Sequence, residues 1–131
     1  MRTLVVEDDY ITSQVMQEVM LSFGDCDIAE DGAQAIELFQ SSLVNDLRYD
    51  VIFLDIMMPE MDGQQVLDAI RKIEEANNIL GLDCVKIVMT TALDDYNNIR
   101  TAFTNQAEGY LVKPIDKDKV VQVLINLGLL G

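Results

Sequence analysis

Short apolar runs alternate with segments of helical periodicity along the chain, and this alternation limits the possible folds more than any other feature. Each run is four or five residues long, and the five runs together are rich in Val, Ile and Leu, as expected for buried strands. The runs are Thr3–Val6, Cys26–Ala29, Val51–Leu54, Val85–Met89 and Gly109–Val112. Strands that alternate with helices predict a parallel sheet with right-handed crossovers and helices on both faces.

The segments between these runs predict helices. In the first segment, Ile11, Val15 and Val19 recur every fourth residue and indicate a helix that ends near Gly24. The next two segments begin with Asp31 and Asp62, each followed by Gly and then by Gln at the third position, a typical N-terminal cap. The apolar positions that indicate the remaining helices and are expected to face the core are Ile36, Phe39, Leu43, Val66, Ile70, Ile73, Ile99, Ala102, Phe103, Val120, Val123, Leu124 and Leu127.

The composition is that of a single acidic globular domain. The chain has 131 residues, half of them hydrophobic, and its formal net charge is −14. This charge disfavours binding to nucleic acid and to anionic membranes. No apolar run approaches the ~20 residues needed to span a bilayer, and acidic residues interrupt the N-terminus where a signal peptide would be apolar. We therefore expect a cytoplasmic protein that neither enters membranes nor binds nucleic acid directly.

Histidine is absent and there are two cysteines, which excludes several chemistries. Without imidazole there is no histidine catalysis, no histidine ligation of metals or haem, and no phosphohistidine carrier role. Cys26 and Cys84 are too few for a structural zinc site and are not spaced as a redox pair. We expect both to be small hydrophobic side chains.

Polar side chains follow the predicted strands at their carboxyl ends, where open parallel sheets place their functional sites. These residues are Glu7, Asp8 and Asp9 after the first strand, Asp55 after the third, Thr91 after the fourth and Lys113 after the fifth. Gathered carboxylates repel one another unless a hard cation binds them, and Mg²⁺ prefers such oxygen ligands. The lone Asp55 is the expected phosphoryl acceptor, while Glu7 and Asp8 hold the cation. Lys113 and Thr91 are expected to contact the phosphoryl oxygens.

Four motifs at these strand ends make the chain resemble the response-regulator receiver domains of the CheY type, from about Arg2 to Leu127. The motifs are Val5-Val6-Glu7-Asp8, the run from Asp55 to Gly63 (DIMMPEMDG), Thr91-Ala92, and the run from Gly109 to Pro114 (GYLVKP). The resemblance implies an α/β fold, a (βα)5 doubly wound five-stranded parallel sheet of strand order 2-1-3-4-5, flavodoxin- or CheY-like. We expect residues 1–131 to be a single receiver domain with no output domain.

The resemblance also assigns a role to each matching residue. It makes Asp55 the phosphorylation site and gives Mg²⁺ the ligands Glu7, Asp8, Asp55 and the backbone carbonyl of Met57. It makes Thr91, Ala92, Lys113 and Tyr110 the phosphate-binding and switch residues, and the Lys113–Pro114 peptide bond cis. Asp9 lies one position beyond the acidic pair and is left without a role.

Such a domain is a signalling module rather than an enzyme. The resemblance implies that a sensor histidine kinase or a histidine phosphotransfer protein donates the phosphoryl group, and that a changed surface contacts a downstream protein target or output domain. That surface would include Tyr96, Arg100, Tyr110, Lys117 and Lys119. In the family, the positions of Met57 and Leu93 border the path of the water that hydrolyses the acyl phosphate. Both residues are apolar, which predicts slow loss of the phosphoryl group.

Two other functions compete with this interpretation. A small-molecule phosphatase resembling the haloacid dehalogenase group also uses an Asp nucleophile with Mg²⁺, but it needs a second Asp where this chain has Met57. A flavodoxin-like FMN binder needs a phosphate loop rich in donors, whereas the acids that follow Val6 repel an anion. For Tyr110, a partly buried aromatic residue at the sheet edge is the simpler alternative to a switch residue.

The strand order that the resemblance implies also bears on the cysteines. It separates Cys26 and Cys84 by three strand positions, or about 14 Å at ~4.8 Å for each step. A disulfide requires Cα atoms within ~7 Å of each other. We therefore expect no disulfide.

Overall fold

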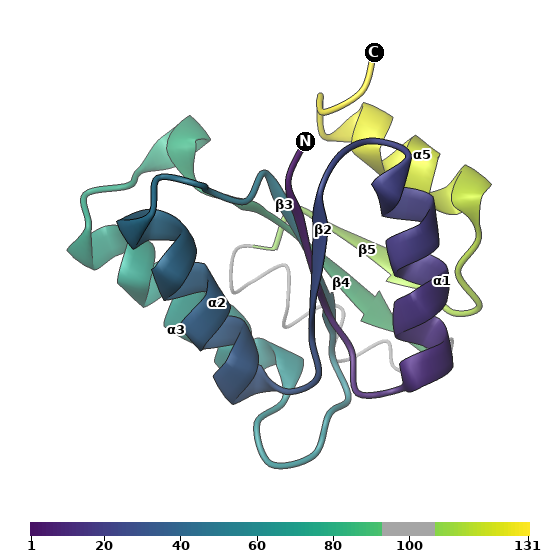
Figure 1. Ribbon diagram of the computed structural model, residues 1–131, viewed down its shortest axis with the longest axis horizontal. Helices are drawn as coiled ribbons and strands as arrows, with labels where there is room; N and C mark the ends of the chain where they lie inside the picture. Colours follow the sequence, from purple (N-terminus) through teal and green to yellow (C-terminus); the bar gives the residue numbers. More distant parts are fainter. Residues whose placement is uncertain (93–106) are drawn as a thin grey trace.

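The computed structural model describes residues 1–92 and 107–131, which form a five-stranded parallel sheet flanked by helices (Figure 1). The strands are β1 (Thr3–Val6), β2 (Cys26–Ala29), β3 (Val51–Asp55), β4 (Lys86–Thr91) and β5 (Gly109–Val112). The helices are α1 (Tyr10–Leu21), α2 (Gly32–Val44), α3 (Gly63–Ala76) and α5 (Lys117–Asn126), with a 3-10 turn, η1, at Gly81–Asp83. The strand order β2-β1-β3-β4-β5 confirms the predicted fold. The helix expected around Ile99 lies outside the described residues.

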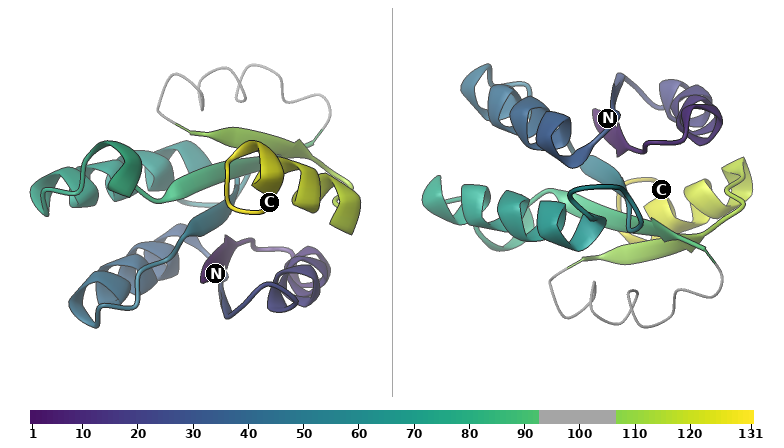
Figure 2. Two further views of the ribbon diagram at one scale, coloured as in Figure 1. Left: turned by 90° about the horizontal axis from the view of Figure 1, so that it is seen from above. Right: turned by 90° about the horizontal axis from the view of Figure 1, so that it is seen from below.

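The sheet separates two apolar layers, as Figure 2 shows from above and below. Helices α2 and α3 cover one face, and α1 and α5 cover the other. The α2–α3 layer is centred on Leu4, Ile52, Leu54 and Ile87, and the α1–α5 layer on Phe53 and its neighbours. Strands β1 and β3 are buried over their full length because both faces are covered, which explains their unbroken apolar sequences.

Strand β4 begins one residue later and ends two residues further on than the sequence predicts. Thr90 pairs with Asp55 of β3, and Thr91 pairs with Val112 of β5, so both threonines belong to the sheet. Threonine is β-branched and fits the pleated surface well. The longer strand places the Thr91 side chain at the same edge of the sheet as Asp55.

Aspartates cap the N-termini of the four α-helices in the described residues. Asp31 accepts a hydrogen bond from the backbone N–H of Gln34, and Asp62 forms a complete capping box with Gln65, so both predicted caps are confirmed. Asp116 caps α5 in the same way. Asp9, to which the sequence assigned no role, caps α1 by accepting from the backbone N–H of Thr12.

The periodicity of Ile11, Val15 and Val19 indicated α1 correctly, but it does not mark the buried face of the helix, and of the three only Val19 packs against the core. Ile11 is 72% exposed and Val15 is 41% exposed, whereas Met16 and Met20 of the same helix are buried. Helix α1 has apolar residues on more than one side, so its periodicity fits two different faces. The long thioether side chains of Met16 and Met20 fill the space beside Phe53 under the helix, and this packing determines which face is buried.

Opposite the carboxyl ends of the strands, a buried ion-pair network supports the start of β4. The guanidinium group of Arg71 lies 2.7 Å from Glu74 and 2.8 Å from Glu108. The two carboxylates also accept hydrogen bonds from the backbone N–H groups of Val85 and Ile87. Side chains thus satisfy the N–H groups at the start of β4, just before its first pairing with β5 at Val88.

Both cysteines are free, as predicted. Residues 41–49 and 74–83 meet near this end of the sheet, where Arg48 donates a hydrogen bond to the carbonyl of Asp83. Within the described part of the chain, no helix has both the length and the apolar character needed to cross a membrane.

Candidate functional site

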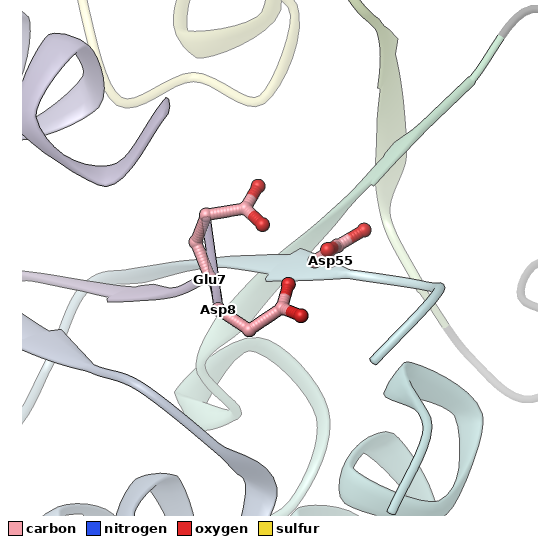
Figure 3. A group of neighbouring side chains, drawn as sticks. All are labelled: Glu7, Asp8 and Asp55. Carbon is pink, nitrogen blue, oxygen red and sulfur yellow. The ribbon is translucent and has the colours of Figure 1, made fainter. Parts of the chain in front are cut away.

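The carboxyl ends of β1 and β3 bring together three of the predicted acidic residues (Figure 3). One oxygen atom from each of Glu7, Asp8 and Asp55 lies within 4.8 Å of the others. Glu7 and Asp55 are each only 3% exposed, whereas Asp8 is open to solvent. Because β1 and β3 are adjacent parallel strands in register, residues 48 positions apart in the sequence end at the same edge.

Lys113 joins this acidic cluster from the end of β5. Its Nζ atom lies 2.9 Å from Oε1 of Glu7 and 3.5 Å from Oδ1 of Asp55. The peptide bond from Lys113 to Pro114 is cis. Four of the five charged side chains that the sequence placed at the strand ends therefore form one cluster, and Asp9 is the one outside it.

Burial and neighbouring charge perturb the acidity of this cluster. Burial, together with the hydrogen bond to Glu7 and the repulsion by its charge, raises the pKa of Asp55 to about 8, although Lys113 and the N–H of Met57 act to lower it. For Lys113, burial lowers the pKa, but the hydrogen bonds and attraction to Glu7 and Asp55 outweigh this effect and raise it overall. The Lys113 ammonium group is thus shared between the two buried carboxyl groups, and the exposed Asp8 adds a third acidic side chain beside them.

The donor set of this pocket fits a hard divalent cation. Three carboxylate oxygens lie close enough to share one ion, and oxygen is the ligand that Mg²⁺ prefers. Met57, whose backbone carbonyl was expected as a further ligand, lies in the turn after β3, and its N–H donates to Oδ1 of Asp55. Asp9 lies outside this donor set and caps α1 instead. The hydroxyl and the backbone N–H of Thr12 both donate hydrogen bonds to its carboxylate and thereby lower the pKa of Asp9.

Gly63, a residue that the sequence analysis did not assign to the site, determines how closely α3 approaches Asp55. A Cβ atom at Gly63 would lie 2.4 Å from the carbonyl oxygen of Asp55 and 2.8 Å from Cα of Ile56. The N–H of Gly63 donates to the carbonyl of Ile56, which closes the turn after β3. The Asp-Gly pair at the start of α3 was the available signal, but it was interpreted only as a cap.

The remaining predicted site residues lie on β4 and β5. Thr91 is buried at the end of β4, and its hydroxyl donates to the carbonyl of Ala92, which is exposed. Tyr110 is 45% exposed and lines a groove of about 500 Å³ between β5 and α5, together with Lys119. Tyr110 therefore lies on the surface, as a sheet-edge aromatic does. Leu93, Tyr96 and Arg100 lie outside the described residues.

The fold and the site together define a doubly wound α/β domain with an acidic pocket at the carboxyl end of its sheet. Residues 3–125 match the response regulator receiver domain family, and the chain belongs to that family. This is a signalling module of two-component systems rather than a catalytic one. Receiver domains bind Mg²⁺ at this acidic pocket and interact with histidine kinases and downstream proteins.

Several curated relatives are similar over nearly the whole chain. The chain is 30% identical to the probable transcriptional regulator ycf29 of Porphyra purpurea, covering 95% of this chain and 54% of that protein. It is 32% identical to hybrid signal transduction histidine kinase L of Dictyostelium discoideum, covering 99% of this chain and 7% of that protein. The chain thus spans about half, or much less, of the length of these relatives.

Solved structures show the same fold. Vibrio cholerae chemotaxis protein CheY4 superposes with a TM-score of 0.80 at 25% identity, covering 95% of this chain and 96% of that one. The CheX-CheY-BeF3-Mg complex from Borrelia burgdorferi gives a TM-score of 0.80 at 26% identity, covering 97% and 88%.

Proposed function

We propose that Asp55 accepts a phosphoryl group from the phosphohistidine of a sensor histidine kinase or a histidine phosphotransfer protein. A carboxylate oxygen of Asp55 attacks phosphorus, the P–N bond breaks, and the electron pair returns to the imidazole nitrogen as an acyl phosphate forms. The observation that supports this most directly is the position of Asp55, a buried carboxyl group between Glu7, Asp8 and Lys113. No other acid in this cluster ends a fully buried central strand.

The residues expected to hold Mg²⁺ are Glu7, Asp8, Asp55 and the backbone carbonyl of Met57. When bound, the cation supplies positive charge to the phosphoryl oxygens and offsets the repulsion among the carboxylates. Asp8 is the exposed member of this set and would bind the cation on the side that faces solvent. The buried Glu7 would bind the cation on the side that faces the protein.

Lys113 and Thr91 support the phosphorylated state in this proposal. The Lys113 ammonium already lies 3.5 Å from Asp55, so it needs only a short movement to contact a phosphoryl oxygen. The Thr91 hydroxyl now donates to the Ala92 carbonyl and can exchange this partner for a phosphoryl oxygen. The backbone N–H of Ala92 is a second donor at the same edge.

The outcome of phosphorylation is a shift between two arrangements of the face around Tyr110. Movement of Thr91 toward the phosphoryl group makes room behind it, and inward rotation of Tyr110 fills that room. The surface groove beside β5 would change shape as a result and alter contact with a downstream protein target or output domain. We infer that residues 1–131 act as one receiver domain, since the family match spans residues 3–125.

The phosphatase alternative receives no support from the site. It requires a carboxylic acid two residues after the nucleophile, and Met57 stands there with an exposed thioether side chain. Met57 cannot donate or accept a proton at a leaving group.

Mass spectrometry of the intact chain after incubation with acetyl phosphate and Mg²⁺ tests the proposal. We expect one added phosphoryl group in the wild type and none in Asp55→Asn. Asp9→Asn is the matched control, because asparagine caps a helix as well as aspartate does and Asp9 lies just outside the acidic cluster. Modification that persists in Asp55→Asn, or no modification of the wild type, would contradict the assignment.

A further inference from the structure

One methionine differs from the others in its exposure to solvent. The sequence has seven methionines, and all of them lie in the part of the chain that the structure describes. The side chain of Met57 is 61% exposed. The remaining methionines are buried or half-buried, namely Met1, Met16, Met20, Met58, Met61 and Met89. An oxidant in the solvent therefore reaches the thioether of Met57 more readily than that of any other methionine.

Met57 also adjoins the phosphoacceptor. It lies two residues after Asp55, and its backbone N–H donates a hydrogen bond of 3.2 Å to Oδ1 of Asp55. Its neighbours in the chain, Ile56 and Met58, are 2% and 8% exposed. The backbone of this turn is thus held beside the acceptor carboxylate, while the side chain of Met57 is open to solvent.

The folded chain can accept a chemical change at this position. Oxidation converts the apolar thioether of methionine into a polar sulfoxide. At Met16 or Met89, which are 1% and 0% exposed, the new S=O group would be buried in the core at a large cost in stability. At Met57 the sulfoxide oxygen remains in contact with water. The oxidised chain therefore keeps its fold and its acidic pocket.

From this exposure and this position we infer that Met57 is a site of reversible oxidation by peroxides, and that its sulfoxide shortens the lifetime of the acyl phosphate on Asp55. With hydrogen peroxide, the sulfur attacks one oxygen, the O–O bond breaks and water leaves. The sulfur loses two electrons and the peroxide gains them. A methionine sulfoxide reductase reverses the change by oxidising a dithiol to a disulfide and releasing water.

The effect on lifetime rests on the proposed function, since it requires a phosphoryl group on Asp55. A thioether sulfur is a weak hydrogen-bond acceptor, whereas a sulfoxide oxygen is a strong one. In the oxidised chain this oxygen accepts a hydrogen bond from the water that attacks phosphorus, and so orients it. The P–O bond to Asp55 breaks, and its electron pair returns to the carboxylate. Hydrogen phosphate leaves, and one proton passes to the solvent.

Peptide mass spectrometry after brief treatment with hydrogen peroxide tests the modification site. In the folded chain we expect sulfoxide to form at Met57 at least about tenfold faster than at Met16, Met20 or Met89. In concentrated urea, where exposure no longer differs, these four rates should become similar. Oxidation of any other methionine as fast as that of Met57 in the folded chain, or unequal rates in urea, would overturn the assignment.

Decay of a radiolabelled phosphoryl group tests the consequence of oxidation. The wild type is treated with hydrogen peroxide, freed of it, and then labelled with acetyl phosphate and Mg²⁺. It should lose the label about threefold or more faster than untreated protein. Incubation of the oxidised protein with a methionine sulfoxide reductase and dithiothreitol before labelling should restore the slower rate.

Two leucine variants show whether Met57 is responsible. Peroxide should not change the decay rate of Met57→Leu, whereas it should accelerate decay in Met61→Leu, at a half-buried position, as it does in the wild type. Unchanged or slower decay in the oxidised wild type, or equal acceleration in Met57→Leu, would overturn the inference. Failure of untreated wild-type protein to take up the label would instead contradict the proposed function itself.

Discussion

The Nζ atom of Lys113 lies 2.9 Å from Oε1 of Glu7, a closer approach than it makes to Asp55. Without a phosphoryl group, the lysine thus serves mainly to neutralise an acid that is 3% exposed. A buried carboxylate that loses its cationic partner is costly. The pair therefore contributes to the stability of the folded chain as well as to the proposed chemistry.

Replacing Lys113 by methionine should destabilise the metal-free protein by about 2 kcal/mol, since the buried carboxyl group of Glu7 then loses its cationic partner. Added Mg²⁺ should recover part of this loss. Urea unfolding with EDTA and with Mg²⁺ measures both effects, and Lys117→Met, at an exposed position on α5, is the matched control. Equal stability of the two variants in EDTA would show that Lys113 is not needed to balance these carboxylates.

The raised pKa of Asp55 predicts how stability depends on pH. A carboxyl group whose pKa rises from 3.8 to about 8 on folding holds its proton more tightly in the folded state than in the unfolded one. The free energy of unfolding of the metal-free protein should therefore fall as the pH rises from about 4 to about 8.

Asp55→Asn removes this titration, so it should flatten the profile and stabilise the protein at neutral pH. Mg²⁺ should oppose the fall in the wild type, because the ionised carboxylates bind the cation in the folded state only. Denaturant titrations across this pH range measure the slopes. A wild-type profile that rises toward pH 8 in EDTA would refute the assigned protonation.

The fold and much of the site could be predicted because both depend on local patterns. Buried strands and Asp caps are visible in the sequence, and the topology of a parallel sheet places strand ends such as Asp55 and Lys113 at one edge. The buried face of α1 could not be predicted, because the helix carries apolar residues on more than one side. Packing beside Phe53 determines that the side with Met16 is the buried one. Contacts between distant side chains leave no periodic signal in the sequence.

The network of Arg71, Glu74 and Glu108 is such a contact. Arg71→Met should cost about 3–5 kcal/mol, since Glu74 is 1% exposed and would remain as an unpaired buried charge. Lys72→Met, at an exposed position on the same helix, should change the free energy of unfolding little. Urea unfolding measures the free energy of unfolding of both variants. Similar stabilities would mean that Glu74 takes up a proton or reaches water when Arg71 is absent.

The apolar side chain of Met57 predicts that the acyl phosphate on Asp55 is hydrolysed slowly. Its side chain is 61% exposed beside the acceptor and offers no hydrogen bond to an attacking water. Met57→Asn supplies a donor and an acceptor that can orient this water, so the acyl phosphate should decay severalfold faster, while Met57→Leu should leave the rate unchanged. Loss of radiolabel after removal of the donor measures both rates. Equal or slower decay in Met57→Asn would contradict the prediction.

Gly63 should be less tolerant of substitution than Gly32, although both begin a helix directly after an aspartate cap. A Cβ atom at Gly63 would meet the backbone of Asp55 and Ile56, whereas at Gly32 it would meet only side chains, those of Val66 and the more flexible Met61. Backbone cannot move aside without displacing the phosphoacceptor. Gly63→Ala should therefore be the more destabilising change, by about 1–3 kcal/mol relative to Gly32→Ala.

The same displacement should also weaken metal binding, which separates a local effect on the site from a general loss of stability. Helix α3 begins at Gly63, and its shift would move Asp55 relative to Glu7 and Asp8. We expect Gly63→Ala to bind Mg²⁺ more weakly than Gly32→Ala when each is measured by calorimetry at a temperature where both are folded. Equal affinities would mean that the turn after β3 absorbs the added methyl group without moving the carboxylate, so that the close approach of α3 serves packing alone.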